Sequence, residues 1–356
     1  MKKYDRQTRL PEVGEEGQRQ LARASVLCVG AGGLGSSALL YLAAAGVGHI
    51  GIIDFDNVDE SNLQRQIIFD ARSGGRKKTS AAEERLLALN PDTHVTTYDA
   101  RLDSRNAGKI FPNYDVIIDG TDNFTAKFLI NDAARKYSKP WVYGAIQGYD
   151  GQVAVFDTSG PCYRCLYPAP PKAAIANCAE NGVLGPVAGM IGTAQALQTL
   201  LLLLGHEKFS PLRGKLWLID CMSMATRELH IPRAKNCKIC GIAPESIVLE
   251  NETAAACAAV PQVSPEQARK LARAVFIDVR ESPELAAGMI PNALHLPLSA
   301  LRAGLAEKPQ LAADTPVVLY CQRGQRSLAA APIVQDMGFT AVLSLAGGYG
   351  AWKKQP

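Results

Sequence analysis

The sequence predicts a two-domain α/β protein: a mostly parallel sheet with flanking helices, followed by a smaller α/β domain. Three observations lead to this prediction. The chain has 356 residues, more than one hydrophobic core usually organises. Short apolar runs alternate with helical patterns through the first two thirds, as in parallel sheets covered by helices. After an alanine-rich, weakly periodic segment, a second α/β pattern begins.

The first domain is expected to alternate strands with helices. Runs of valine, isoleucine and leucine at 25–30 and 49–54 are typical of buried parallel strands. Helical patterns follow at 36–45 and 77–89, and the second of them stops at an Asn-Pro pair. By the same criteria, further strands are expected at 115–119, 141–145, 151–156, 215–220 and 226–231, with a helix at 125–136.

One stretch has the length and composition of a membrane helix. Residues 181–205 carry no charge and end in a run of leucines. However, Pro186, Gln195 and Gln198 interrupt the stretch, and no aromatic or basic belts flank it. We therefore predict a helix buried inside a large α/β domain and no membrane association.

The second domain is expected after the break in pattern between residues 242 and 260. Ser264 opens a helix there, and the residues that remain suffice for an independent small domain. Its strands are expected at 274–278 and 317–320, with a helix at 327–338. We therefore predict a first domain at 1–244, a linker at 245–259 and a second domain at 260–356.

Composition excludes several classes of protein. The net charge of +4 is small and dispersed, which does not favour nucleic-acid binding. The hydrophobic share of 47% and charged share of 20% are ordinary for a soluble globular chain. The nine cysteines include two Cys-x-x-Cys pairs, and no export signal is recognisable. This usage indicates metal binding and reactive thiols in a reducing compartment, so we expect a cytoplasmic protein.

A glycine turn between the first strand and its helix predicts a Rossmann-like nucleotide site. The turn runs from Gly30 to Gly35 as Gly-Ala-Gly-Gly-Leu-Gly. Glycines at this position let backbone N–H groups and the positive helix end contact phosphate. Asp54 ends the next strand, at the spacing where a carboxylate accepts hydrogen bonds from ribose hydroxyls. Most such turns bind NAD or FAD, so a dehydrogenase is an alternative at this point.

Basic residues after the turn favour a triphosphate over a dinucleotide. They are Arg65, Arg76, Lys77 and Lys78. They supply more cations than a pyrophosphate needs, and they suit a triphosphate whose leaving group must be neutralised. The sequence around Asp122 follows the strand at 115–119 and offers a carboxylate where Mg²⁺ can bind. The alternative is that the cations form only a solvated face.

Two Cys-x-x-Cys pairs predict one structural zinc site. They are Cys162 with Cys165 and Cys237 with Cys240, about seventy residues apart. Four thiolates at this local spacing suit tetrahedral Zn²⁺, and a four-cysteine site leaves no open position for catalysis. The alternative is two unrelated or redox-active pairs.

Another cysteine lies in a loop between a strand and a helix. Cys321 follows the strand at 317–320, and Ser327 begins the helix, so the loop's N–H groups are expected to form an anion nest. Arg323 and Arg326 add positive charge, and such surroundings favour a thiolate or persulfide nucleophile. Cysteine phosphatases have one residue more between cysteine and arginine. The tighter ring suits a sulfur atom better than a tetrahedral oxyanion.

Several motifs together resemble the enzymes that adenylate ubiquitin-like sulfur-carrier proteins, above all the molybdopterin-synthase adenylyltransferases. The similarity runs from Tyr4 to about Gly241. It implies that ATP activates the carrier's C-terminal glycine as an acyl-adenylate, with release of pyrophosphate. The motifs are Tyr4-Asp5-Arg6-Gln7, the glycine turn, Asp54-Phe55-Asp56, Ser61-Asn62-Leu63-Gln64-Arg65-Gln66, Thr121-Asp122-Asn123 and Pro161-Cys162-Tyr163-Arg164-Cys165.

The resemblance implies roles for individual residues. Asp122 would bind Mg²⁺, and Arg6 would reach the triphosphate of a partner subunit, which implies a homodimer. Cys178 lies in a crossover loop where related enzymes form a covalent carrier bond or accept persulfide sulfur, a role that other members do without. Asn62, Arg65 and Lys78 would contact the phosphates. Nucleotide contacts are implied in all for Gly30, Gly32, Gly33, Gly35, Asp54, Asn62, Arg65, Lys78, Asp122 and Asn123.

The segment after the linker resembles rhodanese domains. The resemblance rests on the residues 277–281, 321–327 and 345–352, although the family more often has His and Gly where Met289 and Asn292 stand. It implies a persulfide on Cys321 with Arg326 beside it, supplied by a cysteine desulfurase or thiosulfate. A module that only docks a partner is the alternative. The expected catalytic residues are Cys321, Arg326, Asp122 and Cys178.

Together, the two halves predict an enzyme that adenylates a sulfur carrier ending in Gly-Gly and then converts the adenylate to a thiocarboxylate. The resemblance points to molybdopterin, that is molybdenum cofactor, biosynthesis, and a thiamine-pathway or other carrier is the alternative. A dehydrogenase leaves the rhodanese-like half without a role. An adenylating relative that acts on RNA or a peptide is not favoured by the weak net charge.

Overall fold

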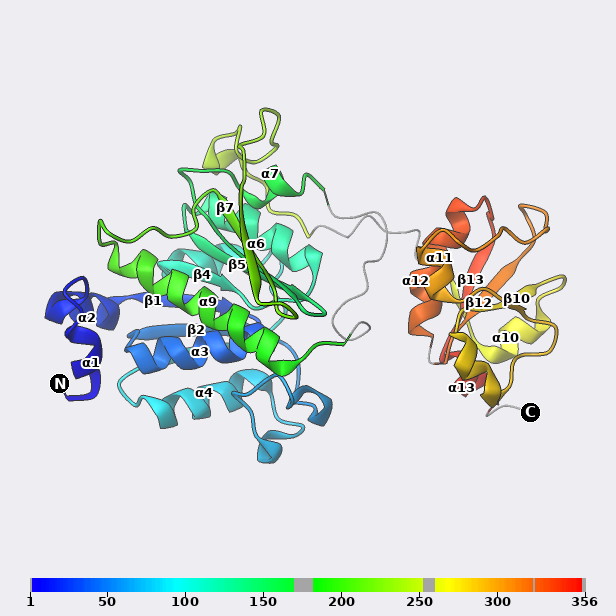
Figure 1. The fold of residues 1–356 in the computed structure, drawn as a ribbon, viewed down its shortest axis with the longest axis horizontal. Helices are drawn as coiled ribbons and strands as arrows, with labels where there is room; N and C mark the ends of the chain where they lie inside the picture. The colour runs from blue at the N-terminus through cyan, green and yellow to red at the C-terminus, as the bar shows by residue number, and fades with distance from the viewer. Residues whose placement is uncertain (1, 170–181, 252–259, 323, 354–356) are drawn as a thin grey trace. The chain divides into compact units, whose positions relative to one another are not determined.

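The computed structural model describes residues 2–169, 182–251, 260–322 and 324–353. Within these residues the chain forms two compact units. The first unit contains the larger sheet and the second the smaller one (Figure 1). Both are α/β arrangements, which confirms the predicted fold class.

The larger sheet has eight strands within the described residues, in the order β3-β2-β1-β4-β5-β6-β7-β8. Pairings from β3 to β5 are parallel, and those from β5 to β8 are antiparallel. Because β2 and β4 lie on opposite sides of β1, the chain reverses its direction of winding there, and ligands usually bind at such a point. The strands are β1 (Ser25–Val29), β2 (His49–Asp54), β3 (His94–Asp99), β4 (Val116–Asp119), β5 (Trp141–Gln147), β6 (Asp150–Phe156), β7 (Lys215–Asp220) and β8 (Ala225–His230).

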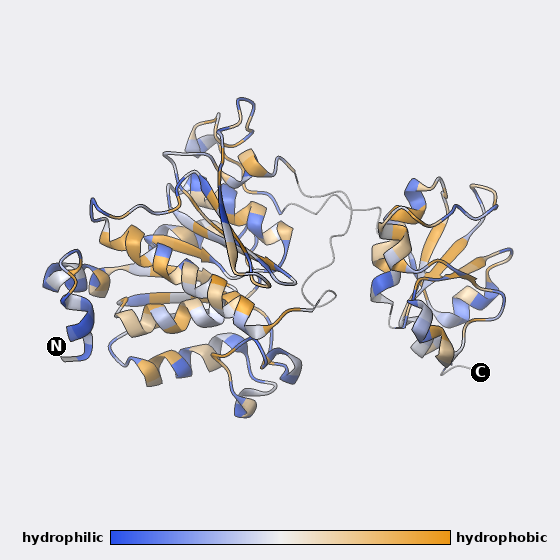
Figure 2. Cartoon of the chain, in the orientation of Figure 1, coloured by the Kyte–Doolittle hydropathy of each residue, from blue (hydrophilic) through white to orange (hydrophobic). Residues whose placement is uncertain are grey.

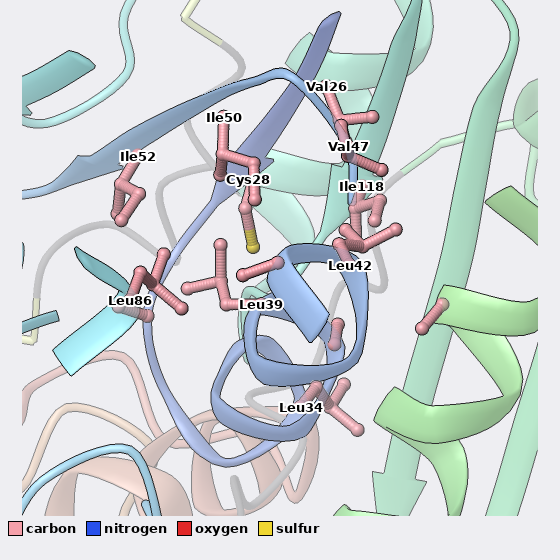
Figure 3. Packing of buried hydrophobic residues seen from close by; sticks show 14 of the residues in the cluster. Val26, Cys28, Leu34, Leu39, Leu42, Val47, Ile50, Ile52, Leu86 and Ile118 are labelled. Carbon is pink, nitrogen blue, oxygen red and sulfur yellow. The ribbon is translucent and has the colours of Figure 1, made fainter. Parts of the chain in front are cut away.

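Both faces of the central parallel strands β1, β2 and β4 are buried, which explains why these strands are apolar without alternation. Val26 and Cys28 of β1 face α3 (Gly33–Ala45), and Leu27 and Val29 belong to the core on the opposite face. Figure 3 shows the Cys28 sulfur directed toward α3, close to Leu39. The other helices of this unit are α1 (Asp5–Thr8), α2 (Gly14–Arg23), α4 (Lys78–Leu89), α5 (Ala107–Ile110), α6 (Phe124–Lys136), α7 (Tyr163–Leu166) and α9 (Gly185–Leu204).

The apolar stretch forms α9, which is long and apolar enough to cross a membrane by length and composition alone. It lies along α3 and also contacts β5 and β6 (Figure 1), and it is largely apolar along its length (Figure 2). Gln195 is completely buried on the inner side, where its Nε2 donates to the carbonyl oxygens of Asp119 and Val142. The polar residues that interrupt the stretch thus serve packing inside the domain.

The second unit is built on five parallel strands within its described residues, in the order β11-β10-β12-β13-β9. Its strands are β9 (Gln262–Val263), β10 (Val275–Asp278), β11 (Leu294–His295), β12 (Val317–Tyr320) and β13 (Val342–Leu345). Its helices are α10 (Pro265–Lys270), α11 (Leu298–Arg302), α12 (Gln325–Asp336) and α13 (Gly348–Lys353). The four residues of β12 are fully buried, so the loop that follows starts from a rigid strand.

The end of the first unit extends into the expected linker. Ile247 is buried, and Lys136 Nζ donates to its carbonyl oxygen at 2.5 Å. The backbone N–H of Ser104 donates to Asn251 Oδ1 at 2.8 Å. Residues 245–251 therefore contact the first unit, and residues 252–259 lie outside the described part of the chain. The domain limits at 244 and 260 stay a prediction.

Candidate active sites

The glycine turn leaves the N-terminus of α3 open. The chain passes Gly30 with φ +93°, and α3 begins at Gly33 without a side-chain cap on its first turn. A side chain at Gly35 would place its Cβ 2.1 Å from the carbonyl oxygen of Gly30, so glycine is required for this close approach. The uncapped N–H groups of the first turn are therefore available to an anion such as phosphate.

Asp54 is positioned beside the turn by backbone hydrogen bonds. It ends β2 and is 8% exposed. One carboxylate oxygen accepts from the N–H of Ala31 at 2.8 Å, and the other accepts from the N–H of Asp56 at 2.9 Å. Burial raises the pKa of Asp54 above its usual value. The predicted ribose-binding carboxylate is thus held rigidly at the edge of the glycine turn.

The structure places two of the three predicted phosphate-binding residues together. Arg65 donates to Asn62 Oδ1 at 2.8 Å. The Cγ of Arg65 would lie 3.6 Å from a Cβ at Gly33, so Arg65 lies over the first turn of α3. The third, Lys78, is almost fully buried and donates to Asp56 at 3.0 Å. Asp56 was not among the predicted site residues, and its carboxylate fixes the Lys78 ammonium group near the end of β2.

Asp122 and Asn123 follow β4 at the same edge of the sheet. Asp122 is exposed, so its carboxylate is accessible to a cation. Asn123 is the N-cap of α6, and its Oδ1 accepts from the N–H of Ala126 at 2.9 Å. Asn123 therefore shapes the turn that carries Asp122, in addition to the nucleotide contact predicted for it.

A buried ion pair beneath this turn was missed in the sequence. Lys127 donates to Asp119 Oδ2 at 2.6 Å, to the carbonyl oxygen of Thr121 at 3.0 Å and to that of Gly144 at 2.8 Å. Asp119 in turn accepts from the N–H and the hydroxyl of Thr121. The pair ties the loop before Asp122 to two strands. Lys127 lies four residues before the buried Asn131, on the same side of α6. A lysine on this side of the helix was the signal that could have revealed the pair.

Arg6 lies far from the glycine turn of its own chain. Its helix α1 is docked by Gln7, whose Nε2 donates to the carbonyl oxygen of Ala45 at 3.0 Å. Ala45 ends α3, whereas the turn precedes its first residue, and a helix of this length spans roughly 20 Å. The exposed Arg6 therefore belongs to the opposite end of α3 from the turn.

The four cysteines of the two pairs converge on one point. Their Sγ atoms all lie within 4.8 Å of one another, and the Cys162–Cys237 and Cys165–Cys240 pairs are each 3.6 Å apart. Tetrahedral Zn²⁺ with Zn–S bonds of about 2.3 Å sets its sulfur atoms roughly 3.8 Å apart, which these positions fit. A hydrogen bond from Cys162 lowers the pKa of Cys240 to about 5, whereas burial raises the pKa of Cys165. Thiols crowded in this way are suited to exchange protons for a metal ion.

The Cys321 loop has the geometry of an anion nest. Cys321 is 1% exposed, and its Sγ accepts from the N–H of Gly324 at 3.2 Å. Gly324 has φ +90°, which aims its N–H at the sulfur. The hydroxyl of Ser327 donates to the carbonyl oxygen of Gly324 at 2.9 Å, and the N–H of Tyr349 donates to the carbonyl oxygen of Cys321 at 2.7 Å. Both contacts close the loop around the sulfur atom.

Arg326 lies in the first turn of α12, which begins two residues earlier than expected because Gly324 forms its N-cap. Its guanidinium binds both carboxylate oxygens of Glu284, at 2.5 and 2.6 Å. Glu284 was not recognised in the sequence, where no spacing connects it to the loop. The pKa of Arg326 is raised by the hydrogen bonds to Glu284 and, to a smaller extent, by the Cys321 thiol. Arg326 therefore interacts with both the acid and the thiol.

A second buried pair supports the loop from below. Arg280 is completely buried, and its Nη2 donates to Asp278 at 2.6 Å and to the carbonyl oxygen of Gly288 at 2.7 Å. The guanidinium also lies 4.3 Å from the ring centre of Tyr349.

Asn292 has φ +60°, a conformation that asparagine tolerates better than most residues. The departure from glycine at this position is thus accommodated by the backbone.

Two predicted site residues lie outside the described residues. Cys178 falls within 170–181, and Arg323 is the single undescribed position in the Cys321 loop. The remaining candidates form three groups: the nucleotide edge of the larger sheet, the cysteine cluster and the Cys321 loop. Arg6 is the described candidate that joins none of them.

Comparisons with known proteins assign both parts of the chain. The ThiF family model matches residues 4–241, which is more than half of the chain. The rhodanese-like domain model matches residues 264–355.

Named relatives match over most of their own length. A probable adenylyltransferase/sulfurtransferase MoeZ of Mycobacterium tuberculosis is 39% identical, covering 99% of this chain and 93% of that protein. A sulfur carrier protein adenylyltransferase of Thermus thermophilus is 47% identical, covering 68% of this chain and 91% of that protein. An adenylyltransferase and sulfurtransferase MOCS3 of Culex quinquefasciatus is 35% identical, covering 99% and 87%.

Solved structures share the fold of the first part. Crystal structures of E. coli MccB with succinimide and with ATP have TM-scores of 0.59 and 0.57, at 20% and 21% identity. They cover 67% and 63% of this chain, and 74% and 69% of those chains. At this identity the likeness shows the fold alone. From the family matches and the full-length relatives, the chain belongs to the ThiF family, carries a rhodanese-like domain after its ThiF domain, and is an adenylyltransferase and sulfurtransferase.

Proposed function

We propose that this enzyme adenylates the C-terminal glycine of a ubiquitin-like sulfur-carrier protein ending in Gly-Gly and then replaces AMP with sulfur from a persulfide on Cys321. One observation carries the proposal. The same chain has an open phosphate-binding turn in a ThiF domain and a cysteine, Cys321, whose sulfur accepts a backbone hydrogen bond in a rhodanese-type loop. The name of the Thermus thermophilus relative supports a sulfur carrier as the substrate.

The adenylation step needs a positive site for the triphosphate. The carrier carboxylate attacks the α-phosphate, and pyrophosphate leaves with the bonding electron pair. Arg65 and the N–H groups of the first turn of α3 are positioned to hold phosphate oxygens, and Asp54 to hold the ribose. Asn62 and Lys78 orient this set through their bonds to Arg65 and Asp56. The glycines Gly30, Gly32, Gly33 and Gly35 allow the nucleotide to approach the backbone.

Mg²⁺ accompanies ATP in the proposed reaction. The exposed carboxylate of Asp122 would hold it, and the ion would neutralise charge on the departing pyrophosphate. Asn123 and the buried Lys127–Asp119 pair fix the turn on which Asp122 stands. The carboxylate is therefore carried by a rigid support.

Sulfur transfer then uses the adenylate as an activated acyl group. The terminal sulfur of the Cys321 persulfide attacks the acyl carbon, and AMP leaves, which gives an acyl disulfide. A second thiol, from Cys178 or a small molecule, cleaves the S–S bond, so the carrier leaves as a thiocarboxylate and Cys321 enters a disulfide with that thiol. Arg326 would stabilise negative sulfur at Cys321. The sulfur donor is a cysteine desulfurase or thiosulfate.

The proposal includes a homodimer. Arg6 is exposed at the opposite end of α3 from the turn of its own chain, so it suits contact with the triphosphate of a partner subunit. The cysteine cluster would hold one structural Zn²⁺ through Cys162, Cys165, Cys237 and Cys240. We place the enzyme in the cytoplasm, because Cys321 and these cysteines must remain reduced to act. Molybdopterin biosynthesis is the pathway proposed.

ATP–pyrophosphate exchange tests the adenylation step. Exchange should depend on adding a candidate carrier ending in Gly-Gly, and the same carrier without its last glycine is the matched control. The molybdopterin-type carrier should support exchange better than a thiamine-type carrier. Exchange that is equally fast without any carrier would contradict the proposal. If exchange is normal but thiocarboxylate never forms, the rhodanese-like domain serves only for docking.

A further inference from the structure

Glu284 forms an ion pair with Arg326, the arginine that interacts with Cys321. The Nη1 and Nη2 atoms of Arg326 donate to the two separate carboxylate oxygens of Glu284. This bidentate arrangement is the strongest for an arginine and a carboxylate. About a third of each side chain is exposed, so solvent and small ions can reach the pair. The positive charge of Arg326 is therefore already neutralised before any donor arrives.

The acid is fixed to the same framework as the loop. Glu284 lies in the turn η6 (Ser282–Ala287) and also accepts from the N–H of Glu281 at 3.0 Å. The Nη1 of Arg280 lies 3.5 Å from both the Glu284 carbonyl oxygen and Gln322 Oε1. Hydrogen bonds from Arg326 lower the pKa of Glu284 to about 2, so the carboxylate stays charged at physiological pH. The neutralising group is thus a permanent part of the site.

The two arginines that the structure describes around the loop are each paired with a carboxylate. Arg326 is paired with Glu284, and Arg280 is paired with the buried Asp278. The hydroxyl of Ser327 is used by Gly324 and by Ser344, the latter at 2.8 Å. The Cys321 sulfur accepts a hydrogen bond from the uncharged backbone N–H of Gly324, and Arg326 also interacts with it.

This charge balance discriminates between classes of sulfur donor. With thiosulfate, the Cys321 thiolate attacks the outer sulfur, the S–S bond breaks, and sulfite leaves with the electron pair as a dianion. With a persulfide R–S–SH, the same attack expels R–S⁻, which carries one negative charge, and the proton stays with the transferred sulfur. Thiosulfate is a dianion that must approach the Glu284 carboxylate and leave beside it as another dianion, whereas a persulfide carries at most one negative charge on its reacting sulfur and meets weaker repulsion.

We propose that Glu284 is a specificity-determining residue that withholds Arg326 from free dianionic donors and so favours sulfur delivered as a persulfide. The inference rests on the proposed function of Cys321 as the sulfur-accepting residue. It assigns to Glu284 a role in rejecting one donor class, distinct from simply holding Arg326 in place. The two roles give opposite results when the carboxylate is neutralised.

The test uses the full chain with Glu284→Gln, which keeps the shape but removes the charge. Thiosulfate–cyanide sulfurtransferase activity should show a lower KM for thiosulfate and a kcat/KM raised about tenfold, the size of one charge-assisted contact. Sulfur uptake from cysteamine persulfide, whose ammonium group balances the charge of its persulfide anion, should change by less than about twofold. The gain with thiosulfate should also shrink as salt is added, because the freed Arg326 attracts the dianion through a screened charge.

Two further variants make the result specific. Glu281→Gln is the matched control, because Glu281 lies in the same segment and bonds Ser299 instead of Arg326, and its thiosulfate kinetics should match the wild type. Glu284→Asp keeps the charge on a shorter side chain and should retain the preference for persulfide. If Glu284→Gln does not fold, Glu284→Ala with the same two donors replaces it.

Different outcomes test the role of Glu284 and the proposed function of Cys321 separately. If Glu284→Gln lowers the rates with both donors, Glu284 only positions Arg326 and the inference is wrong. If mass spectrometry finds no added sulfur on Cys321 of the wild-type enzyme with either donor, the proposed function of Cys321 fails instead.

Discussion

Lys127 and Asp119 form an ion pair that is almost completely excluded from solvent, with Nζ 2.6 Å from the carboxylate. All three donors of the ammonium group have partners, because it also bonds the carbonyl oxygens of Thr121 and Gly144. The pair therefore joins the end of β4 to β5 directly beneath the turn that carries Asp122. Its loss should affect both folding and adenylation.

Replacing Lys127 with Met should destabilise the first unit by roughly 3–5 kcal/mol, because the buried Asp119 carboxylate would lose its partner. Calorimetry of the full chain should show a lower unfolding temperature for that unit. Arg72→Ala is the control, since Arg72 is 90% exposed in its pair with Asp70 and such pairs contribute about 0–1 kcal/mol. Equal shifts for the two variants would contradict the structural role of Lys127.

Replacing Asp122 with Ala should reduce ATP–pyrophosphate exchange by at least about 10²-fold, through loss of the proposed Mg²⁺ contact. Thiosulfate sulfurtransferase activity should remain at the wild-type level. Because Asp122 is exposed, its removal should leave the unfolding temperature unchanged. Asp92→Ala removes another exposed aspartate and is expected to leave exchange intact. Normal exchange with Asp122→Ala would refute the assignment.

As pH falls, protonation of the buried Asp54 should weaken ATP binding, whereas the contribution of Asp54 to the stability of the fold should increase. Burial raises its pKa in the folded state, so the folded protein holds this proton more tightly than the unfolded chain. Its contribution to stability is therefore present at low pH and is lost as pH rises from the unfolded pKa through the raised folded value. ATP binding requires the carboxylate and should weaken as pH falls through the same range. Asp54→Asn should remove this pH dependence of the KM for ATP, and an unchanged profile would count against the ribose contact.

Chelation or replacement of one cluster cysteine should lower the stability of the first unit, because metal binding is coupled to folding. Cys165→Ser is the variant of choice, and Cys221→Ser is its control, since Cys221 is a free thiol outside the cluster. Elemental analysis should find one zinc per chain in the wild type and in Cys221→Ser. Protein purified without zinc, yet fully stable, would overturn the metal assignment.

Replacing Cys321 with Ala should preserve carrier adenylation and abolish thiocarboxylate formation from thiosulfate or a persulfide donor. The carrier's mass reports the result directly, because sulfur replaces one oxygen in the thiocarboxylate. Cys28→Ala is not a suitable control, since Cys28 is completely buried in the core, whereas Cys221 is only partly buried at the edge of that core, and Cys221→Ala is the milder change. Thiocarboxylate formed at the wild-type rate by Cys321→Ala without added sulfide would show that another residue delivers the sulfur.

The sequence predicted the buried strands best. β2 and β7 begin and end where expected, because apolar runs bounded by turns define a fully buried or paired strand. No strand was expected at β3, whose residues His94–Asp99 are mostly half-exposed at the edge of the sheet. Helix starts were displaced at α3 and α12, because both helices have a glycine as N-cap and therefore no side-chain cap to mark their start. Edge strands and uncapped helices carry weak local signals.

For the candidate sites too, some features were predictable from the sequence and others were not. The spacing in the sequence was sufficient to predict that the four cysteines converge, because two local pairs need only one long-range contact to meet. The partners that orient the site were not predictable: Glu284 and Asp56 reach Arg326 and Lys78 from separate segments. Ion pairs of this kind depend on tertiary packing, and no periodicity in the sequence encodes them. The roles of the site residues stay predictions for the experiments above.

The separation of the cysteine pairs sets the order in which this domain can be completed during synthesis. Cys162 and Cys237 are 75 positions apart, and the chain between them includes α9, β7 and β8. The ribosome releases β1 to β6 first, so the nucleotide edge of the sheet can assemble while its last strands are still being made. The cluster closes only after Cys240 has emerged. Metal loading would therefore be a late step, which secures a sheet whose nucleotide-binding half has already formed.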